Sequence, residues 1–244
     1  MANIRNINFN AMINKASNIA AAGNEMQRAV KQAFERIAQM SSDWNGGSYD
    51  RFVETVNRAV PSLNNLFHTV VSDIPHEIAA KAKAYAASTQ TPASASFSEA
   101  TVLIINEVSK TNRDGEFRFL SDKVASDQTA IKGFFDKARQ SAERAKAVCQ
   151  SLKSDWDSVS GDTNIYDLIA AFKKLDLLLV EFSSALDQQI AVQELKINAA
   201  ETAASAAEKV NDIKDDAVDA AKQAAAAATD AINQSIADWK AFFM

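Results

Sequence analysis

Apolar residues recur at alternating steps of three and four along several long stretches of this chain. The first stretch keeps this spacing for nine consecutive steps, and its members are Met12, Ala16, Ile19, Gly23, Met26, Val30, Ala33, Ile37, Met40 and Trp44. Such spacing is typical of a helix whose narrow apolar seam faces other helices. It predicts a helix over residues 8–43, roughly 50 Å long at 1.5 Å per residue.

A turn containing Trp44, Asn45 and Gly46 is predicted to end this helix. The run Asn-Gly-Gly provides residues that tolerate the positive φ values needed to reverse the chain. Ser48 is expected to cap the next helix, and Asp50 to lie in its first turn, where a negative charge is favourable.

A second apolar seam follows the turn, and its members are Tyr49, Val53, Val56, Val60, Leu63, Phe67, Val70, Ile74, Ile78 and Tyr85. Pro61 and Pro75 interrupt it, and a proline costs about 3 kcal/mol in a helix interior. The second helix therefore either curves or breaks into pieces. Together the two seams predict an antiparallel helical hairpin over residues 1–90.

Residues 91–115 are predicted to be a linker with a short helix. Small polar residues fill positions 89–96, a helix is expected at about 97–110, and Asn112-Arg113-Asp114-Gly115 predicts a further turn.

The pattern then restarts and predicts a second hairpin over residues 116–200. Its first seam comprises Leu120, Val124, Ile131, Phe135, Ala138, Ala142, Ala145, Cys149, Leu152 and Trp156, and its second Leu168, Phe172, Leu175, Leu179, Phe182, Leu186 and Ile190. The first of these helices ends in Ser-Asp-Trp at Trp156, as the earlier one does at Trp44. We interpret this as a weak duplication with a period near 112 residues, whose second turn contains Gly161.

Residues 201–244 predict an Ala-rich C-terminal helix with a narrow apolar face, comprising Ile213, Ala217, Ala220, Ala224, Ala231 and Trp239. Such a face buries little area, so this helix must pack on the rest of the protein or on a partner. The sequence therefore predicts an all-α protein, in which long antiparallel hairpins form a four-helix-bundle-like assembly with an added Ala-rich helix. The two hairpins are expected to pair within one chain as a pseudo-dimer, or the chain to form a homodimer.

The net charge and the positions of the cysteine and histidines argue against several classes of function. The net charge of −5 and the pI near 5.2 argue against a nucleic-acid partner. Cys149, the single cysteine, lies on a seam and is expected to be buried. His68 and His76 are eight residues apart, about 12 Å along a helix, which is too far to share a metal. We expect no enzyme, no cofactor and no metal.

The N-terminus lacks the apolar core of a cleavable signal peptide. The most apolar stretch, residues 100–106, is far shorter than the roughly 20 residues that cross a bilayer. No transmembrane segment is therefore expected. The protein either is exported by a route without a cleavable signal or stays in the cytoplasm.

Trp44, Asn45 and Gly46, flanked by two amphipathic helices, resemble the turn of the WXG family of helical-hairpin proteins exported by type VII secretion systems of Gram-positive bacteria. The resemblance covers residues 1–90, with Phe52 in the place of the family's recurring aromatic residue after the turn. Trp156 and Gly161 mark a degenerate second copy, in which Ser158 stands where the motif has glycine. The resemblance implies a secreted helical protein that binds the secretion machinery or a co-secreted helical protein.

Other interpretations remain open at this point. Trp44 can be a core anchor beside a glycine C-cap in an unrelated helical protein. The chain can also be a component of an α-helical pore-forming toxin, or an intracellular helical adaptor or chaperone. The leading hypothesis is a non-enzymatic, secreted interaction protein that acts through exposed helix faces.

Overall fold

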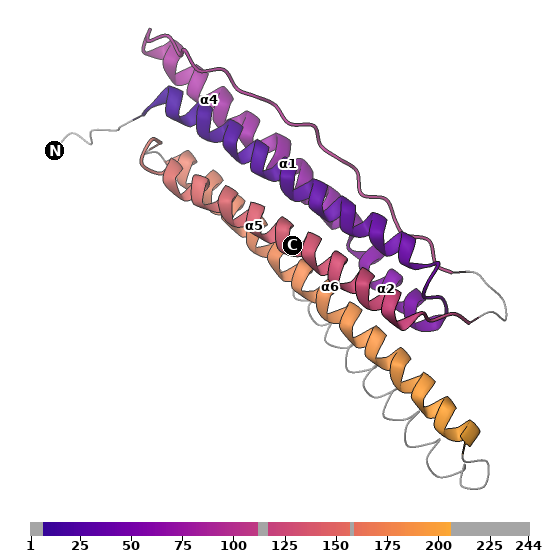
Figure 1. The fold of residues 1–244 in the computed structure, drawn as a ribbon. Coiled ribbons are helices and arrows are strands. Elements are labelled where there is room, and N and C mark those ends of the chain that lie inside the picture. Colours follow the sequence, from indigo (N-terminus) through magenta and orange to yellow (C-terminus); the bar gives the residue numbers. More distant parts are fainter. Residues whose placement is uncertain (1–6, 112–116, 157–158, 206–244) are drawn as a thin grey trace. The chain divides into compact units, whose positions relative to one another are not determined.

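The computed structural model describes residues 7–111, 117–156 and 159–205, and of residues 159–164 and 201–205 the backbone alone. The helices are α1 (Phe9–Met40), α2 (Gly47–Arg58), α3 (Val60–His68), the π-helical segment η1 (Thr69–Asp73), α4 (Ile74–Ser88), α5 (Ser121–Leu152) and α6 (Val159–Ser205) (Figure 1). The predicted all-α class is confirmed for these residues, which contain no strand. The predicted Ala-rich helix lies, from residue 206 on, outside the described residues, as does the predicted turn at 112–115.

The chain divides into two compact units, each assembled from separate segments. Unit 1 comprises Met1–Ala38, Arg58–Val108 and Thr129–Leu179, and unit 2 comprises Gln39–Asn57, Ser109–Gln128 and Val180–Met244. Both units therefore contain residues from each of the two predicted hairpins.

In unit 1, α1 packs against η1 and also runs antiparallel to α5. A Cβ atom added at Gly23 would lie 3.1 Å from the Val71 side chain and 3.2 Å from that of Val70, so glycine permits a close approach of α1 to η1. Glu25 forms an ion pair with Arg144 of α5, and Lys15 forms one with Asp155 just beyond that helix. The partner's number rises as the α1 number falls, which defines the antiparallel direction.

Helices α5 and α6 also lie side by side. In unit 1 the Arg139 Nε atom is 2.5 Å from Asp176 Oδ1. In unit 2 the Gln128 amide donates to Asp187 Oδ1 at 2.5 Å. Because these contacts join opposite ends of the two helices, α5 and α6 are antiparallel.

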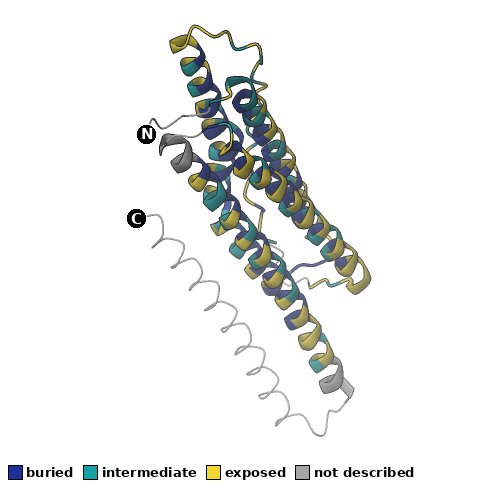
Figure 2. Ribbon diagram, turned by 90° about the vertical axis from the view of Figure 1, so that its left-hand side faces the viewer, coloured by how far each residue is buried: buried dark blue, intermediate teal, exposed yellow. Residues whose placement is uncertain are grey.

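The apolar seams form the cores of the units. Every member of the first seam is buried, and so is the second seam as far as Ile78 (Figure 2). The α5 and α6 seams are buried as well, with one exception. Leu120 is 41% exposed because it precedes α5 and pairs through its backbone with Asp43.

Both prolines lie near the start of a helical segment. Pro61 and Pro75 stand at the first or second positions of α3 and α4, and Pro75 directly follows the π-helical segment η1. The second helix is divided by the turn residue Ala59 between α2 and α3, whereas α3, η1 and α4 follow one another without a gap and keep right-handed helical angles at their joins. The π-helical segment η1 ends directly before α4.

The predicted short helix at 97–110 is wrong. Residues 91–108 run as an extended segment without helix, which we call the strap (Figure 1). Four side chains of α1 and α3 bind its backbone: Asn10 accepts from Ser94 and Ala95, Ser17 from Ser98, Gln27 from Leu103, and Asn64 from Ile105. Gln27 and Asn64 also donate, to the carbonyl oxygens of Thr101 and Ile105.

These bonds explain why the strap is not helical. An extended backbone must find partners for its N–H and C=O groups outside itself, and the amide side chains provide them. Ile105 and Val108 are buried at the same time, so apolar contacts fix the strap as well.

Two further local predictions are wrong. Helix α2 begins at Gly47, so Ser48 lies inside the helix rather than at its cap. Helix α6 begins at Val159, so Gly161 lies in the helix and not in the preceding turn. In both places the helix extends closer to the tryptophan than the turn residues suggest, because glycine and serine tolerate helical φ and ψ values.

Candidate functional site

The turn after α1, in unit 2, is built around Trp44. Its indole is fully buried and packs edge-on against Tyr49 of α2, with ring centroids 5.6 Å apart. Phe119, which precedes α5, makes a second edge-on contact at 6.1 Å. Burial raises the pKa of the Tyr49 hydroxyl above its ordinary value of 10.0. Trp44 therefore joins the end of the first helix to the start of the next two.

Gly46 takes a φ of +108°, a region that other residues rarely adopt. A Cβ atom there would meet only Phe117, at the ordinary contact distance of 3.7 Å, so the backbone rather than space requires glycine. The Gly46 carbonyl accepts the Asp50 N–H at 3.0 Å and starts α2. Gly46 thus reverses the chain and begins the next helix.

Asn45, the middle residue of the motif, binds the segment before α5. Its backbone N–H donates to the Arg118 carbonyl at 3.0 Å, and its side-chain oxygen accepts the Arg118 N–H at 2.6 Å. Trp44 and Phe119 form an antiparallel bridge at the same place, and Leu120 donates to the Asp43 carbonyl at 2.9 Å. We call this set of contacts the Trp44 junction.

Asp50 adds a further tie at the Trp44 turn. Its carboxylate accepts the Thr111 N–H at 2.7 Å and the Thr111 hydroxyl at 2.9 Å. The Gly46 N–H donates to the same hydroxyl at 3.2 Å. Asp50 lies in the first turn of α2, as predicted, and there it also fixes the chain that follows the strap.

The turn after α5, in unit 1, repeats this arrangement around Trp156. This indole is fully buried, and Trp156 forms an antiparallel bridge with Ile7, which precedes α1. The Asn8 N–H donates to the Asp155 carbonyl at 3.0 Å. The ammonium of Lys81 lies 5.5 Å from the indole centroid, close enough for a cation–π contact. We call these contacts the Trp156 junction.

The backbone contacts of the two junctions are related by one sequence interval. Trp156 follows Trp44 by 112 residues, and Phe119 follows Ile7 by the same interval. The interval also relates the two donors, Asn8 and Leu120, and their two acceptors, Asp43 and Asp155. Many buried residues of the two halves are also 112 residues apart, including the identical pairs Ile19 and Ile131, Leu63 and Leu175, Leu66 and Leu178, and Ile78 and Ile190.

The junctions are therefore reciprocal. Ile7, just before α1, pairs with Trp156 in the turn after α5, and Phe119, just before α5, pairs with Trp44 in the turn after α1. The sequence indicated both tryptophans and, as a turn residue, Asn45, but it did not reveal the roles of Ile7 and Phe119. The period near 112 residues, applied to the positions before each helix, was the signal that could have found them.

Neither indole is held by a hydrogen bond among the residues that the structure describes. The Nε1 atoms of Trp44 and Trp156 are buried there without an acceptor. An unpaired buried donor costs roughly 1–3 kcal/mol, so apolar packing of the ring must outweigh that loss. Ring shape and volume, rather than the polar N–H, fix these tryptophans.

The remaining site residues of the sequence analysis are placed in the core. Phe52 is fully buried on α2. Cys149 is fully buried on α5, as predicted, and burial raises the pKa of its thiol to about 12. A thiol in this state is a packing group and a poor nucleophile.

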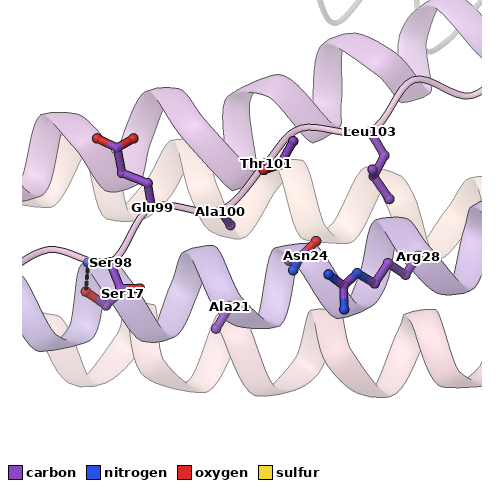
Figure 3. Close-up of a pocket in the computed structure, with 9 residues that line it drawn as sticks. All are labelled: Ser17, Ala21, Asn24, Arg28, Ser98, Glu99, Ala100, Thr101 and Leu103. Carbon is purple, nitrogen blue, oxygen red and sulfur yellow. Dashed lines mark hydrogen bonds between the residues drawn. The ribbon is translucent and has the colours of Figure 1, made fainter.

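A cavity of about 360 Å³ lies between the strap and α1 in unit 1 (Figure 3). Several of its lining residues already form hydrogen bonds within the fold. The Ser17 hydroxyl accepts the Ser98 N–H and donates to the Ile13 carbonyl, and Glu99 accepts from His76 Nε2 at 3.0 Å. In the described residues, no three or more histidine, cysteine, aspartate or glutamate side chains group as metal ligands.

Neither the hydropathy of the helices nor comparison with known proteins indicates a different functional site. Of the helices described, none combines the length and the apolar character that crossing a membrane requires. Comparison with models of known protein families, with curated proteins and with solved structures finds no match. The two tryptophan junctions are accordingly the candidate functional feature of the fold.

Proposed function

We propose that this chain is a non-enzymatic helical interaction protein of the WXG type, exported by a type VII secretion system or paired with one of its substrates. It acts through exposed helix faces rather than through a catalytic site. Its partners are the secretion machinery or a co-secreted helical protein.

The observation that carries this proposal is the geometry of the Trp44 turn. The tryptophan is fully buried at the end of a ten-member seam, and the glycine two residues later holds a φ of +108°. This is the role that the WXG resemblance assigns to both residues. A core tryptophan beside a glycine C-cap in an unrelated helical protein would have the same local geometry, so the export experiment distinguishes the two.

The reciprocal junctions add support. The resemblance implies that hairpins of this kind pair through their apolar seams, and the two hairpins of this chain can pair with each other in that way. Because the seams are already buried, a further protein must bind the outward helix faces.

Export is tested by comparing culture supernatants of a host with a type VII system and of its secretion-ATPase-deficient derivative. We expect the chain in the first supernatant and its loss from the second, with a cytoplasmic marker protein as the control for lysis. Retention of the chain inside the cells of both strains would contradict the proposal.

Two adjacent glycines provide a matched pair for the same assay. Gly46→Ala forces a side chain into positive φ, whereas Gly47 lies in the first turn of α2 and meets only the far end of Arg51, at 3.9 Å. We expect Gly46→Ala to reduce export and Gly47→Ala to leave it unchanged. Equal export of the two variants would show that export does not depend on the conformation of the Trp44 turn.

A further inference from the structure

The central part of the strap, which runs along α1 (Figure 3), is hydrogen-bonded at every second residue. The Gln27 side chain donates to the Thr101 carbonyl at 2.5 Å and accepts the Leu103 N–H at 2.9 Å. The Asn64 side chain accepts the Ile105 N–H at 2.8 Å and donates to the carbonyl of the same residue at 3.0 Å. Successive residues of an extended chain direct their backbone groups to opposite sides. The two amide side chains therefore occupy one edge of the strap.

The opposite edge carries the backbone groups of Val102, Ile104 and Asn106. In the part of the chain that the structure describes, the N–H and C=O groups of these residues have no hydrogen-bond partner. Consecutive members are about 7 Å apart, the repeat of two residues in an extended chain. The Ile104 side chain is 60% exposed beside them. We call these three residues the strap edge.

The strap edge lacks the features that keep free strand edges from pairing. Proteins protect such edges with proline, lysine or an irregularity such as a bulge. Residues 101–107 read Thr-Val-Leu-Ile-Ile-Asn-Glu and contain no proline, glycine or lysine. Four of the seven are β-branched, which favours pairing with a neighbouring strand. The strap edge can therefore accept a further extended chain.

We propose that the strap edge binds an extended segment of a partner protein, which adds to it as a strand. An extended backbone offers C=O and N–H groups at the same two-residue spacing, whereas a helix has already paired its own groups internally. This surface is separate from the helix faces of the proposed function. The inference goes beyond that function and does not depend on export.

The charges of the strap indicate the chemistry of the partner segment. Glu99 and Glu107 are its only charged residues, and both are exposed. An antiparallel second copy centred on Ile104 would place Glu107 opposite Thr101 of that copy, about 7 Å along the strand from its Glu99. A parallel copy in register would set like carboxylates side by side, which is unfavourable. A partner segment with an apolar centre and basic ends fits the strap edge better than a second copy does.

A synthetic peptide tests the proposal on the full chain. The probe is a fluorescently labelled peptide with blocked ends and the sequence Lys-Thr-Val-Val-Val-Thr-Lys. The control peptide has the same side chains but is N-methylated at the three valines, which removes their N–H donors. We expect saturable binding of the probe by fluorescence anisotropy and about tenfold weaker binding of the control, because strand addition depends on main-chain hydrogen bonds. Absence of saturable binding, or equal affinities for the two peptides, would overturn the proposal.

Ile104→Pro removes the central donor of the strap edge. Because the Ile104 N–H has no partner among the described residues, no native hydrogen bond is lost. Proline holds φ at about −65°, which an extended chain allows, and favours an extended conformation at the residue before it. The matched variant Ile104→Ala shortens the side chain and keeps the N–H. We expect Ile104→Pro to weaken probe binding about tenfold and Ile104→Ala to weaken it clearly less. Equal losses would assign binding to the side chain and contradict backbone pairing.

Hydrogen exchange in the unaltered chain gives a second readout that needs no variant. The amides of Leu103 and Ile105 are bonded within the fold and should exchange slowly with or without the probe. The three amides of the strap edge should exchange fast in the free chain and about tenfold more slowly with the probe bound. Equal slowing of both sets would contradict pairing at this edge. Slow exchange at the strap edge without the probe, together with a doubled molecular mass, would assign the edge to a second copy and overturn the choice of a partner protein.

Discussion

Trp44 and Trp156 illustrate how a single side chain can organise two helix ends. Each indole is fully buried, and each lies at a bridge with a residue from the other half of the repeat. Their N–H groups have no acceptor among the described residues, so the contribution of each ring is apolar. Variants of Trp44 should therefore differ in stability according to how much of the ring they keep.

Trp44→Ala should lower the free energy of unfolding by about 3–5 kcal/mol, because it removes a large buried ring and leaves a cavity. Trp44→Phe should cost clearly less, since phenylalanine keeps much of the ring and removes an unpaired donor. Urea denaturation followed by circular dichroism measures both. If phenylalanine cost as much as alanine, a polar role for the indole N–H would be indicated.

Two glycines within helices predict opposite effects. Gly23→Leu should destabilise by about 1–3 kcal/mol, because even a Cβ atom there lies 3.1 Å from Val71. Gly133 on α5 is exposed and has nothing within 4 Å of its added Cβ. Gly133→Ala should therefore stabilise by about 1 kcal/mol through helix propensity. Thermal unfolding of the two variants tests the close contact of α1 with η1.

At the scale of elements, the strap is held by side chains rather than by its own backbone pattern. Asn64 both donates to and accepts from Ile105, at 3.0 and 2.8 Å. Asn64→Ala should cost about 1–3 kcal/mol and speed hydrogen exchange at the Ile105 amide. The exposed neighbour Asn65 provides the control, and Asn65→Ala should change neither quantity. Unchanged exchange in Asn64→Ala would mean that apolar contacts alone hold the strap.

His76 makes the attachment of the strap sensitive to pH. Its ring packs edge-on against Phe97 at 4.8 Å and binds Glu99 and the Ser72 carbonyl. The hydrogen bond to Glu99, followed by that to Ser72, raises the pKa of His76 above its ordinary 6.5, and nearby Asp73 acts in the same direction.

A raised pKa in the folded state means that protonation of His76 favours folding. Its contribution is complete below the unfolded value of 6.5 and is lost as pH rises through the higher folded value. His76→Gln should therefore reduce the difference in stability between about pH 6 and about pH 8.5. His68→Gln leaves the contact with Glu99 intact and should preserve that difference. If the difference in stability between the two pH values fell in His68→Gln but not in His76→Gln, the prediction for His76 would be wrong.

Helix periodicity was sufficient to predict the seams because the partners of a seam residue need only be apolar. Ala138, Ala142 and Ala145 of α5 are buried as predicted although they are small. The strap could not be predicted in this way. Its sequence, which mixes alanine and serine with threonine, valine and isoleucine, suits either a helix or an extended chain, and Gln27 and Asn64, far away in sequence, decide between them.

Only those residues of the candidate site that carry a local sequence signal could be predicted. Trp44 and Gly46 carry a local signal, a seam end followed by a residue that accepts positive φ. Ile7 and Phe119 carry none, since their roles appear only when the other half of the repeat is present. Gly161 was assigned to a turn because glycine usually ends helices, but α6 begins before it.

At the scale of the whole molecule, the reciprocal junctions predict that the chain is a monomer in solution. Each hairpin already has its partner within the chain, so a second copy is not needed to bury the seams. Light scattering coupled to size exclusion should give a mass close to 26.4 kDa. An obligate dimer, together with an isolated first hairpin that also dimerises, would contradict the intramolecular pairing.

The strap also imposes an order in time on folding. Its backbone partners Asn10, Ser17, Gln27 and Asn64 all belong to the first hairpin, which leaves the ribosome before the strap does. The strap can become ordered only when those side chains are already in place. The second hairpin, which begins after it, then meets a first half that is already folded. Synthesis from N- to C-terminus thus favours pairing within one chain over exchange between neighbouring chains.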